Sequence, residues 1–327
     1  MTVVDFHNHF YPPEYFDALR RGGSAVRLTE DEEGNPVLHY PGDYNVAVRG
    51  HRDIEYRAAV MEREGVDLQV LSFTTPGVHV EEPERAAHLA RLVNDAYAAI
   101  VRRYGDRFRA LATLPLNDPP AAARELCRAM DELGLPGASL FSNVNGIPLA
   151  DTRFEQLYAA ADQRKAVLFI HPTSPVGVEA MEQFWLMPLV GFPFDTTLAA
   201  ARLVMSGIAE RYPGIRWVLA HLGGAIPYLA ERLDRGWEAF RECRAHLSRR
   251  PSEVLREFWY DTVNFDPRAL RLAADFAGAG RLLAGSDYPY AIGSITSMKA
   301  SLEAMAVTEE DRACIRGRNA LQLLGMA

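Results

Sequence analysis

The stretch DFHNH, residues Asp5–His9, decides the fold, because it places two histidines directly after a short apolar run. Thr2–Phe6 has the composition of a β-strand, and successive side chains of a strand alternate between its faces, so that His7 and His9 point the same way. Two imidazoles on one face at the carboxyl end of a strand can hold one metal ion. The alternative is a pair of surface histidines in a loop.

Short apolar runs of this kind recur along the chain, and helical patterns separate them. Most are nearly continuous in valine, isoleucine, leucine and phenylalanine, which is typical of parallel strands buried on both faces. The eight predicted strands are Thr2–Phe6, Leu68–Phe73, Arg109–Leu114, Gly137–Phe141, Ala166–Ile170, Ile215–Ala220, Phe258–Thr262 and Arg281–Gly285. Eightfold alternation of strand and helix predicts a (β/α)8 TIM barrel. A doubly wound sheet is the alternative, but no glycine-rich phosphate loop follows the first run.

The helical patterns carry recognisable start signals. Asp118, Asp151 and Asp195 are suitable N-caps, and a proline follows Asp118 at the first helical position. The clearest predicted helices are Asp53–Glu64, Pro83–Arg103, Pro119–Leu133, Asp151–Gln163 and Asp195–Arg211.

Two connections are longer than usual for a barrel. The first, residues 11–52, predicts a small cap inserted after the first strand, within a single domain that spans residues 1–327. The second, residues 172–194, contains Phe184, Trp185 and Phe192. Long loops that follow barrel strands usually carry substrate contacts. These aromatic residues either wall an aromatic pocket or pack within the loop or against a second subunit.

The composition excludes several classes of function. Hydrophobic residues make up 48% of the 327 residues, enough for a large core, and the net charge of −8 argues against nucleic-acid and membrane-surface partners. No apolar run approaches the roughly 20 residues that span a bilayer. Cys127, Cys243 and Cys314 are scattered and form no CxxC pair. Together with the absence of a secretion signal, this pattern predicts a cytoplasmic protein.

Three further polar residues directly follow predicted strands. His171 follows the fifth, His221 the sixth and Asp287 the eighth. A lone histidine in such a place is more often a cap or a buried structural residue, but four histidines and one aspartate at the same end of a barrel predict a shared site. The other histidines are interpreted as solvated or structural, with His51 the exception because it lies near the predicted mouth: His39, His51, His79, His88 and His246.

The motifs around these residues resemble those of the amidohydrolase superfamily. The finer pattern is similar to the branch typified by 2-amino-3-carboxymuconate-6-semialdehyde decarboxylase, and the resemblance runs from residue 3 to about 325. The motifs that carry it are FHNHFYP at 6–12, IHP at 170–172, WLMPLVGFPFDTT at 185–197, AHLGGAIP at 220–227 and GSDYP at 285–289.

The resemblance implies one divalent ion per chain, most often Zn²⁺ and sometimes Mn²⁺. The positions that match its ligands are His7, His9, His171 and Asp287. Three nitrogens and one oxygen leave room for water or substrate, but this set alone does not select zinc over manganese, iron or cobalt. The fourth predicted strand ends without the lysine that bridges two metals as a carbamate, which favours a mononuclear site.

His221 matches the catalytic acid or base of that branch, and a histidine exchanges protons readily near neutral pH. The alternative is that His221 is a fifth ligand. Arg232 matches an arginine that binds a substrate carboxylate across a homodimer interface. Arg49 resembles a second such arginine after a one-residue shift, and either arginine is alternatively a surface ion pair. Trp185 is assigned to the substrate pocket.

The resemblance therefore implies a metal-dependent, non-oxidative decarboxylase of a small aromatic or unsaturated carboxylic acid. Two mechanisms remain open. In one, His221 activates a water that adds to the conjugated acid before CO₂ leaves. In the other, the substrate contacts the metal and Asp287 or His221 protonates the carbon that carried the carboxylate. The alternatives are a hydrolase or hydratase of a lactone, amide or enol acid, and a binding protein without catalysis.

Overall fold

Eight parallel strands form the centre of the molecule. The computed structural model describes residues 2–40 and 43–326. The strands belong to two parallel sheets that hydrogen-bond in the orders β1-β5-β6 and β13-β12-β11-β10-β7. Their bounds are β1 Val4–His9, β5 Leu68–Ser72, β6 Phe108–Ala110, β7 Gly137–Phe141, β10 Val167–His171, β11 Arg216–Leu219, β12 Trp259–Asp261 and β13 Leu282–Leu283.

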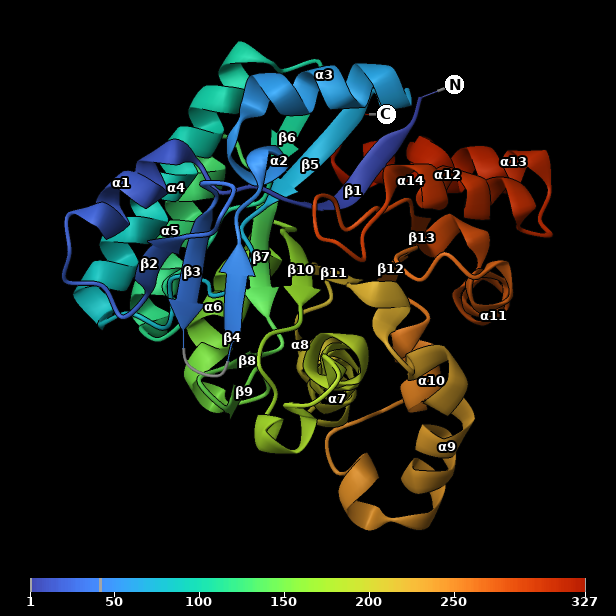
Figure 1. Ribbon diagram of the computed structural model, residues 1–327. Coiled ribbons are helices and arrows are strands. Elements are labelled where there is room, and N and C mark those ends of the chain that lie inside the picture. Colours follow the sequence, from blue (N-terminus) through green and yellow to red (C-terminus); the bar gives the residue numbers. More distant parts are fainter. Residues whose placement is uncertain (1, 41–42, 327) are drawn as a thin grey trace.

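Parallel bridges join the two sheets at both of their edges. Ala112 pairs with Ala138 just beyond β6, and Asn8 of β1 pairs with Tyr288 just beyond β13. The strands therefore form a closed ring with helices outside it (Figure 1). The predicted α/β fold with parallel strands is confirmed, and the ring has the arrangement expected of a TIM barrel, with the carboxyl ends of all eight strands at one end.

An apolar cluster fills the interior of the ring beneath that end. Phe6 of β1 and Phe169 of β10 are fully buried, and their ring centroids are 5.9 Å apart in an edge-to-face arrangement. The ring of Phe169 also lies 5.0 Å from that of His7. The polar residues that follow these strands therefore lie directly above a closely packed apolar interior.

Four of the five predicted helices lie close to the predicted positions. Asp118 accepts a hydrogen bond from the backbone of the helix that it caps, as expected, and Asp53 caps its helix in the same way. The helices are α3 Ile54–Glu64, α4 Pro83–Arg103, α5 Pro119–Asp131, α6 Glu155–Gln163, α7 Phe192–Met205, α8 Ile208–Arg211, α9 Ile226–Ala239, α10 Pro251–Leu255, α11 Pro267–Ala277, α12 Ile295–Ala304, α13 Glu309–Ala313 and α14 Asn319–Leu323.

The predicted helix Asp195–Arg211 is wrong at its start, and it is two helices instead of one. The helix α7 begins at Phe192, so Asp195 lies inside its first turn and is no N-cap. The carboxylate of Asp195 instead accepts hydrogen bonds from Ser142 and Asn143, which follow β7. The chain then breaks at Gly207, whose φ of 73° ends the first helix before α8 begins.

The segment between β1 and α3 folds as a separate small layer. It contains a three-stranded antiparallel sheet flanked by two short helices. The elements are α1 Pro13–Arg20, β2 Arg27–Glu30, β3 Pro36–Tyr40, β4 Asp43–Val46 and α2 Arg49–Arg52. Residues 41–42 of the predicted insertion lie outside the described residues. In Figure 1 this sheet stands beside the carboxyl ends of the barrel strands. Among the described helices, none combines the length and the apolar character that crossing a membrane requires.

Candidate metal and catalytic site

Four of the predicted site residues meet at the carboxyl end of the barrel. His7 and His9 lie at the end of β1, His171 is the last residue of β10, and Asp287 follows β13. All four are buried, and one potential ligand atom from each lies within 4.8 Å of the others. Strands that are far apart in the sequence thus supply one compact cluster.

The spacing inside this cluster suits a metal ion. The Nε2 atoms of His7 and His9 are 3.0 Å apart, and Oδ1 of Asp287 lies 3.4 Å from the first and 3.0 Å from the second. Ligand atoms about 2.1 Å from one ion are about 3.0 Å apart along an octahedral edge and about 3.4 Å apart along a tetrahedral edge. The measured separations match these two values.

The protonation state of the His171 imidazole also suits metal binding. Its Nδ1 lies 2.8 Å from the carbonyl oxygen of Pro172, which fixes the proton on that nitrogen, and its Nε2 is buried with no hydrogen-bond partner in the described part of the chain. Burial lowers the pKa of His171 well below its usual value, and the nearby histidines lower it further. Burial also lowers the pKa of His9 to about 4. Neutral imidazoles with free lone pairs are the form that binds a metal.

Asp261, at the end of β12, orients His7 and was not identified from the sequence. Its Oδ2 lies 2.5 Å from Nδ1 of His7, and its two oxygens accept backbone N–H groups of His221 and Leu222 at 3.1 Å. Burial alone would raise the pKa of Asp261, but the charge and hydrogen bond of His7 hold it below its usual value. A carboxylate behind a ligating histidine fixes the ring and its tautomer. The sequence signal that could have identified Asp261 is its position near the end of the predicted strand Phe258–Thr262.

Arg57 of α3, also not identified from the sequence, holds the end of β1 from behind. Its side chain is fully buried and donates to Oδ1 of Asn8 at 2.6 Å, to the carbonyl of His9 and to the carbonyl of Gly50. A buried guanidinium needs several acceptors, and these contacts provide them. Nothing in the pattern around Arg57 distinguishes it from the other arginines of the amphipathic helices.

His221 stands beside the cluster in a strained turn. Its φ is 52° and that of Leu222 is 58°, values that non-glycine residues adopt only where other contacts enforce them. The two hydrogen bonds to Asp261 enforce this conformation. Gly224 lets the turn lie close against α7, because a Cβ at that position would be 2.0 Å from the carbonyl oxygen of Pro193. The Nε2 of His221 lies 3.8 Å from Oδ2 of Asp287, whereas His7 and His9 contact the other oxygen, Oδ1.

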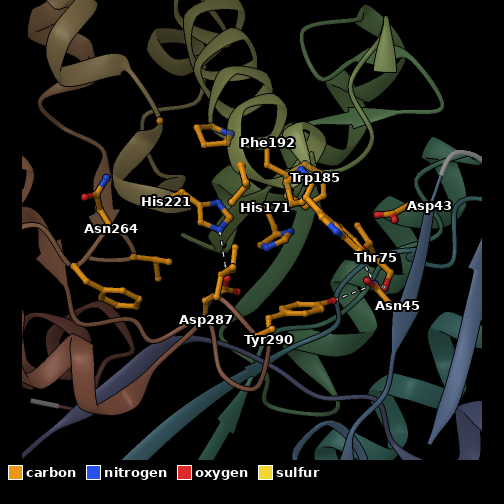
Figure 2. A pocket seen from close by; sticks show the side chains of 18 of the residues that line it. Asp43, Asn45, Thr75, His171, Trp185, Phe192, His221, Asn264, Asp287 and Tyr290 are labelled. Carbon is orange, nitrogen blue, oxygen red and sulfur yellow. Dashed lines mark hydrogen bonds and ion pairs between the residues drawn. The ribbon is translucent and has the colours of Figure 1, made fainter. Parts of the chain in front are cut away.

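The cluster opens into a cavity of about 430 Å³ (Figure 2). His171, His221 and Asp287 lie on its inner side, and aromatic residues that include Trp185 and Phe192 lie above them. This volume suits a small organic molecule. Trp185 lines this cavity, with 58% of its surface exposed.

The two arginines predicted to bind substrate lie elsewhere. Arg49 forms an ion pair with Asp53 at 2.8 Å and covers the ring of Tyr56. Arg232 is exposed on α9, and in the described part of the chain it has no hydrogen bond or ion pair. The residues that line the cavity include no lysine and no arginine.

Comparison with known proteins identifies the family of this chain. The family model for amidohydrolases matches residues 4–326. A 2-amino-3-carboxymuconate-6-semialdehyde decarboxylase of Dictyostelium discoideum is 33% identical and aligns over 99% of this chain and 91% of its own length. A 6-methylsalicylic acid decarboxylase of Penicillium expansum is 31% identical, over 99% of this chain and 96% of its own.

A solved structure extends the likeness to three dimensions. The dihydroxybenzoic acid decarboxylase of Polaromonas, described with bound manganese and the inhibitor 2-nitroresorcinol, matches with a TM-score of 0.82 and 27% identity. The match covers 99% of this chain and 97% of that one. The chain belongs to the amidohydrolase family, and within it to the branch of metal-dependent decarboxylases.

Proposed function

We propose that this protein is a metal-dependent, non-oxidative decarboxylase of a small aromatic or unsaturated carboxylic acid. The observation that carries the proposal is the open side of the buried cluster. His7, His9, His171 and Asp287 converge there, and His221 stands beside them at the floor of an aromatic-lined cavity. The names of the related decarboxylases support this reaction class.

His7, His9, His171 and Asp287 would hold one divalent ion, for which we propose Zn²⁺ with Mn²⁺ as the alternative. Three imidazoles and a carboxylate suit zinc, while the solved relative with bound manganese supports the second choice. When bound, the ion supplies a Lewis acid that stabilises negative charge on the substrate as the carbon–carbon bond breaks. The packed apolar interior of the barrel and the hydrogen bond between Asp261 and His7 keep the ligands in place.

Loss of CO₂ leaves an electron pair on the substrate carbon, and that pair must take up one proton. His221 lines the cavity, and its Nε2 is 3.8 Å from Oδ2 of Asp287, so that it can hold the proton and deliver it. The products are then CO₂ and the substrate with hydrogen in place of its carboxylate. Asp287 contributes the carboxylate that orients the imidazole.

We also propose that a second copy of the chain completes the site. Among the described residues, no lysine or arginine lines the cavity, and Arg232 is exposed on α9. Phe184, Phe194 and Tyr228 are exposed by 81%, 58% and 78%, and large aromatics are enriched in interfaces. In a two-fold homodimer, Arg232 of each subunit would bind the substrate carboxylate of its neighbour. Arg49 remains a weaker proposal for this role, because it is already paired with Asp53.

Mixed subunits test the shared site. His221→Ala and Arg232→Ala subunits are each expected to be inactive, whereas heterodimers should regain activity because one of their two sites carries neither change. Heterodimers that are demonstrated to form but stay inactive would exclude the cross-subunit role. We also propose that this single-domain enzyme works in a reducing cytoplasm, because its three cysteines are unpaired.

The function is tested by measuring products. Protein purified without chelator is incubated with hydroxybenzoates and muconate-type acids, and released CO₂ is quantified together with the remaining organic product. We expect equal amounts of the two from at least one acid, and none after metal removal or in His221→Ala. Turnover without CO₂, with a hydrolysed or hydrated product instead, would establish the alternative function, a metal-dependent hydrolase or hydratase.

A further inference from the structure

The cavity has one end that the proposed chemistry does not use. Opposite His221, the strand β4 of the inserted sheet contributes Asp43 and Asn45, and Thr75 lies next to them (Figure 2). We call these three residues the β4 end. Because the barrel strands supply the reacting groups, the β4 end is placed to contact the part of the substrate that does not react.

The orientation of the Asn45 amide is fixed by its neighbours. Its Nδ2 donates to the carbonyl oxygen of Thr75 at 2.7 Å and lies 2.8 Å from Oγ1 of the same residue. A carbonyl oxygen only accepts, so the amide nitrogen must face Thr75. The Oδ1 of Asn45 accepts no hydrogen bond from any described residue, which leaves it as an acceptor for a ligand.

Asp43 adds a second acceptor and a negative charge. Its carboxylate accepts the backbone N–H of Tyr44 at 2.7 Å and the hydroxyl of Tyr40 at 3.1 Å, and each oxygen retains a further lone pair. In the part of the chain that the structure describes, no lysine or arginine lines the cavity to balance this charge. The β4 end therefore suits a hydrogen-bond donor and repels an anion.

We propose that the β4 end selects acids with a single carboxylate and a neutral donor, such as a phenolic hydroxyl, on the far part of the molecule, and rejects dicarboxylates. This inference rests on the proposed function, since it concerns the same cavity. Asp43 supplies the rejection by like charge, and Asn45 and Asp43 together accept the donor hydrogen bonds. Both are specificity-determining residues and lie away from the reacting atoms.

Binding measurements on matched acids test the inference without turnover. Metal-loaded His221→Ala protein is titrated calorimetrically with 2,4-dihydroxybenzoate and 2-hydroxyterephthalate, and with 2,5-dihydroxybenzoate and 4-hydroxyisophthalate. Each pair exchanges one hydroxyl for one carboxylate at the same ring position. We expect the better dihydroxy acid to bind at least about tenfold more tightly than its dicarboxylate partner.

Removing the charge of Asp43 should narrow that ratio. In the Asp43→Asn variant on the same background, we expect the preference to fall by at least about tenfold, mainly through tighter binding of the dicarboxylate. Glu182→Gln is the matched control, because Glu182 is an exposed carboxylate near Asp43 that does not line the cavity. It should leave the preference unchanged. Melting temperature and metal content show whether each variant is folded.

The outcomes separate this inference from the proposed function. Equal or tighter binding of the dicarboxylates to the His221→Ala parent overturns the inference, even if wild-type enzyme releases CO₂. An unchanged preference in folded Asp43→Asn also overturns it, and so does binding of none of the four acids. The expected preference without CO₂ release from any acid would instead support the β4 end while contradicting the decarboxylase.

Discussion

The floor and the rim of the cavity are built in different ways. The floor consists of His7, His9, His171 and Asp287, all buried at barrel strand ends and within 4.8 Å of one another. The rim comes from the inserted sheet and the long loop after β10. There, Tyr44 and Trp185 lie with ring centroids 5.8 Å apart and with 42% and 58% of their surfaces exposed.

This difference separates chemistry from selection. Floor residues are held by strands, by Asp261 and by the buried Arg57, so that a change there disturbs several groups at once. Rim residues such as Tyr44 and Trp185 are partly exposed to solvent, and a change there alters what the cavity admits. We therefore expect floor variants to lose metal or turnover, and rim variants to change substrate preference.

The largest effect is expected at the floor, in Asp287→Ala. This variant removes one of the four ligands and the partner of His221, so metal content should fall and CO₂ release should drop by more than about a thousandfold. Metal analysis after gel filtration and a CO₂ assay measure the two effects. The control Asp266→Ala removes a half-buried aspartate that caps α11 outside the cluster, and should keep both. Full metal content in Asp287→Ala would break the assignment of the floor.

His221→Ala should keep its metal and lose turnover. General acid–base groups typically contribute about 10²–10⁴-fold, and the other four groups already complete the cluster. Single-turnover rates and metal content are measured on the same sample. Parallel loss of metal and activity would instead make His221 a ligand, which would extend the floor by one residue.

Asp261→Asn should weaken metal binding without abolishing it. The amide can still bond to the His7 ring but cannot supply the negative charge that fixes its tautomer, and such changes cost about 10- to 100-fold in affinity. Competition with a chelator of known affinity measures the loss, and an unchanged affinity would show that the strand alone orients His7. Asp234→Asn, which removes a carboxylate bonded to Ser252, is the control.

The smallest effect is expected at the rim, in Trp185→Ala. Metal content should not change, and KM should rise about two- to tenfold, the usual contribution of one aromatic contact. Steady-state kinetics on the preferred acid measure the change. Phe240→Ala removes another exposed aromatic side chain outside the cavity and should leave KM unchanged. A large loss of turnover at constant KM would show that a rim residue takes part in the chemistry, which would contradict the distinction between rim and floor.

The floor could be predicted from the sequence because its signals are local. Each of His7, His171 and Asp287 directly follows a short apolar run, and in a parallel barrel all such positions meet at one end. The strand bounds themselves were shifted: the first strand was expected to stop at Phe6, whereas β1 continues through His9. Such shifts do not matter for the site, since the order of the strand ends is unchanged.

The supports and the rim could not be predicted in the same way. The contact between Asp261 and His7 joins residues 254 positions apart, and Arg57 resembles any helical arginine until its acceptors are in place. Asn45 and Asp43 lie in an insertion whose sheet has no counterpart in the barrel pattern. Asp195 is a residue type typical of N-caps, but its carboxylate accepts hydrogen bonds from Ser142 and Asn143 instead. This tertiary contact overrides the local preference.

A metal titration tests the central claim most directly. Metal-free protein receives increasing equivalents of Zn²⁺ or Mn²⁺, and the rate of CO₂ release from the preferred acid is recorded at each step. We predict no activity at the start, a linear rise, and a break at one equivalent per chain. Activity in the metal-free protein, or a break at two equivalents, would contradict a single ion held by His7, His9, His171 and Asp287.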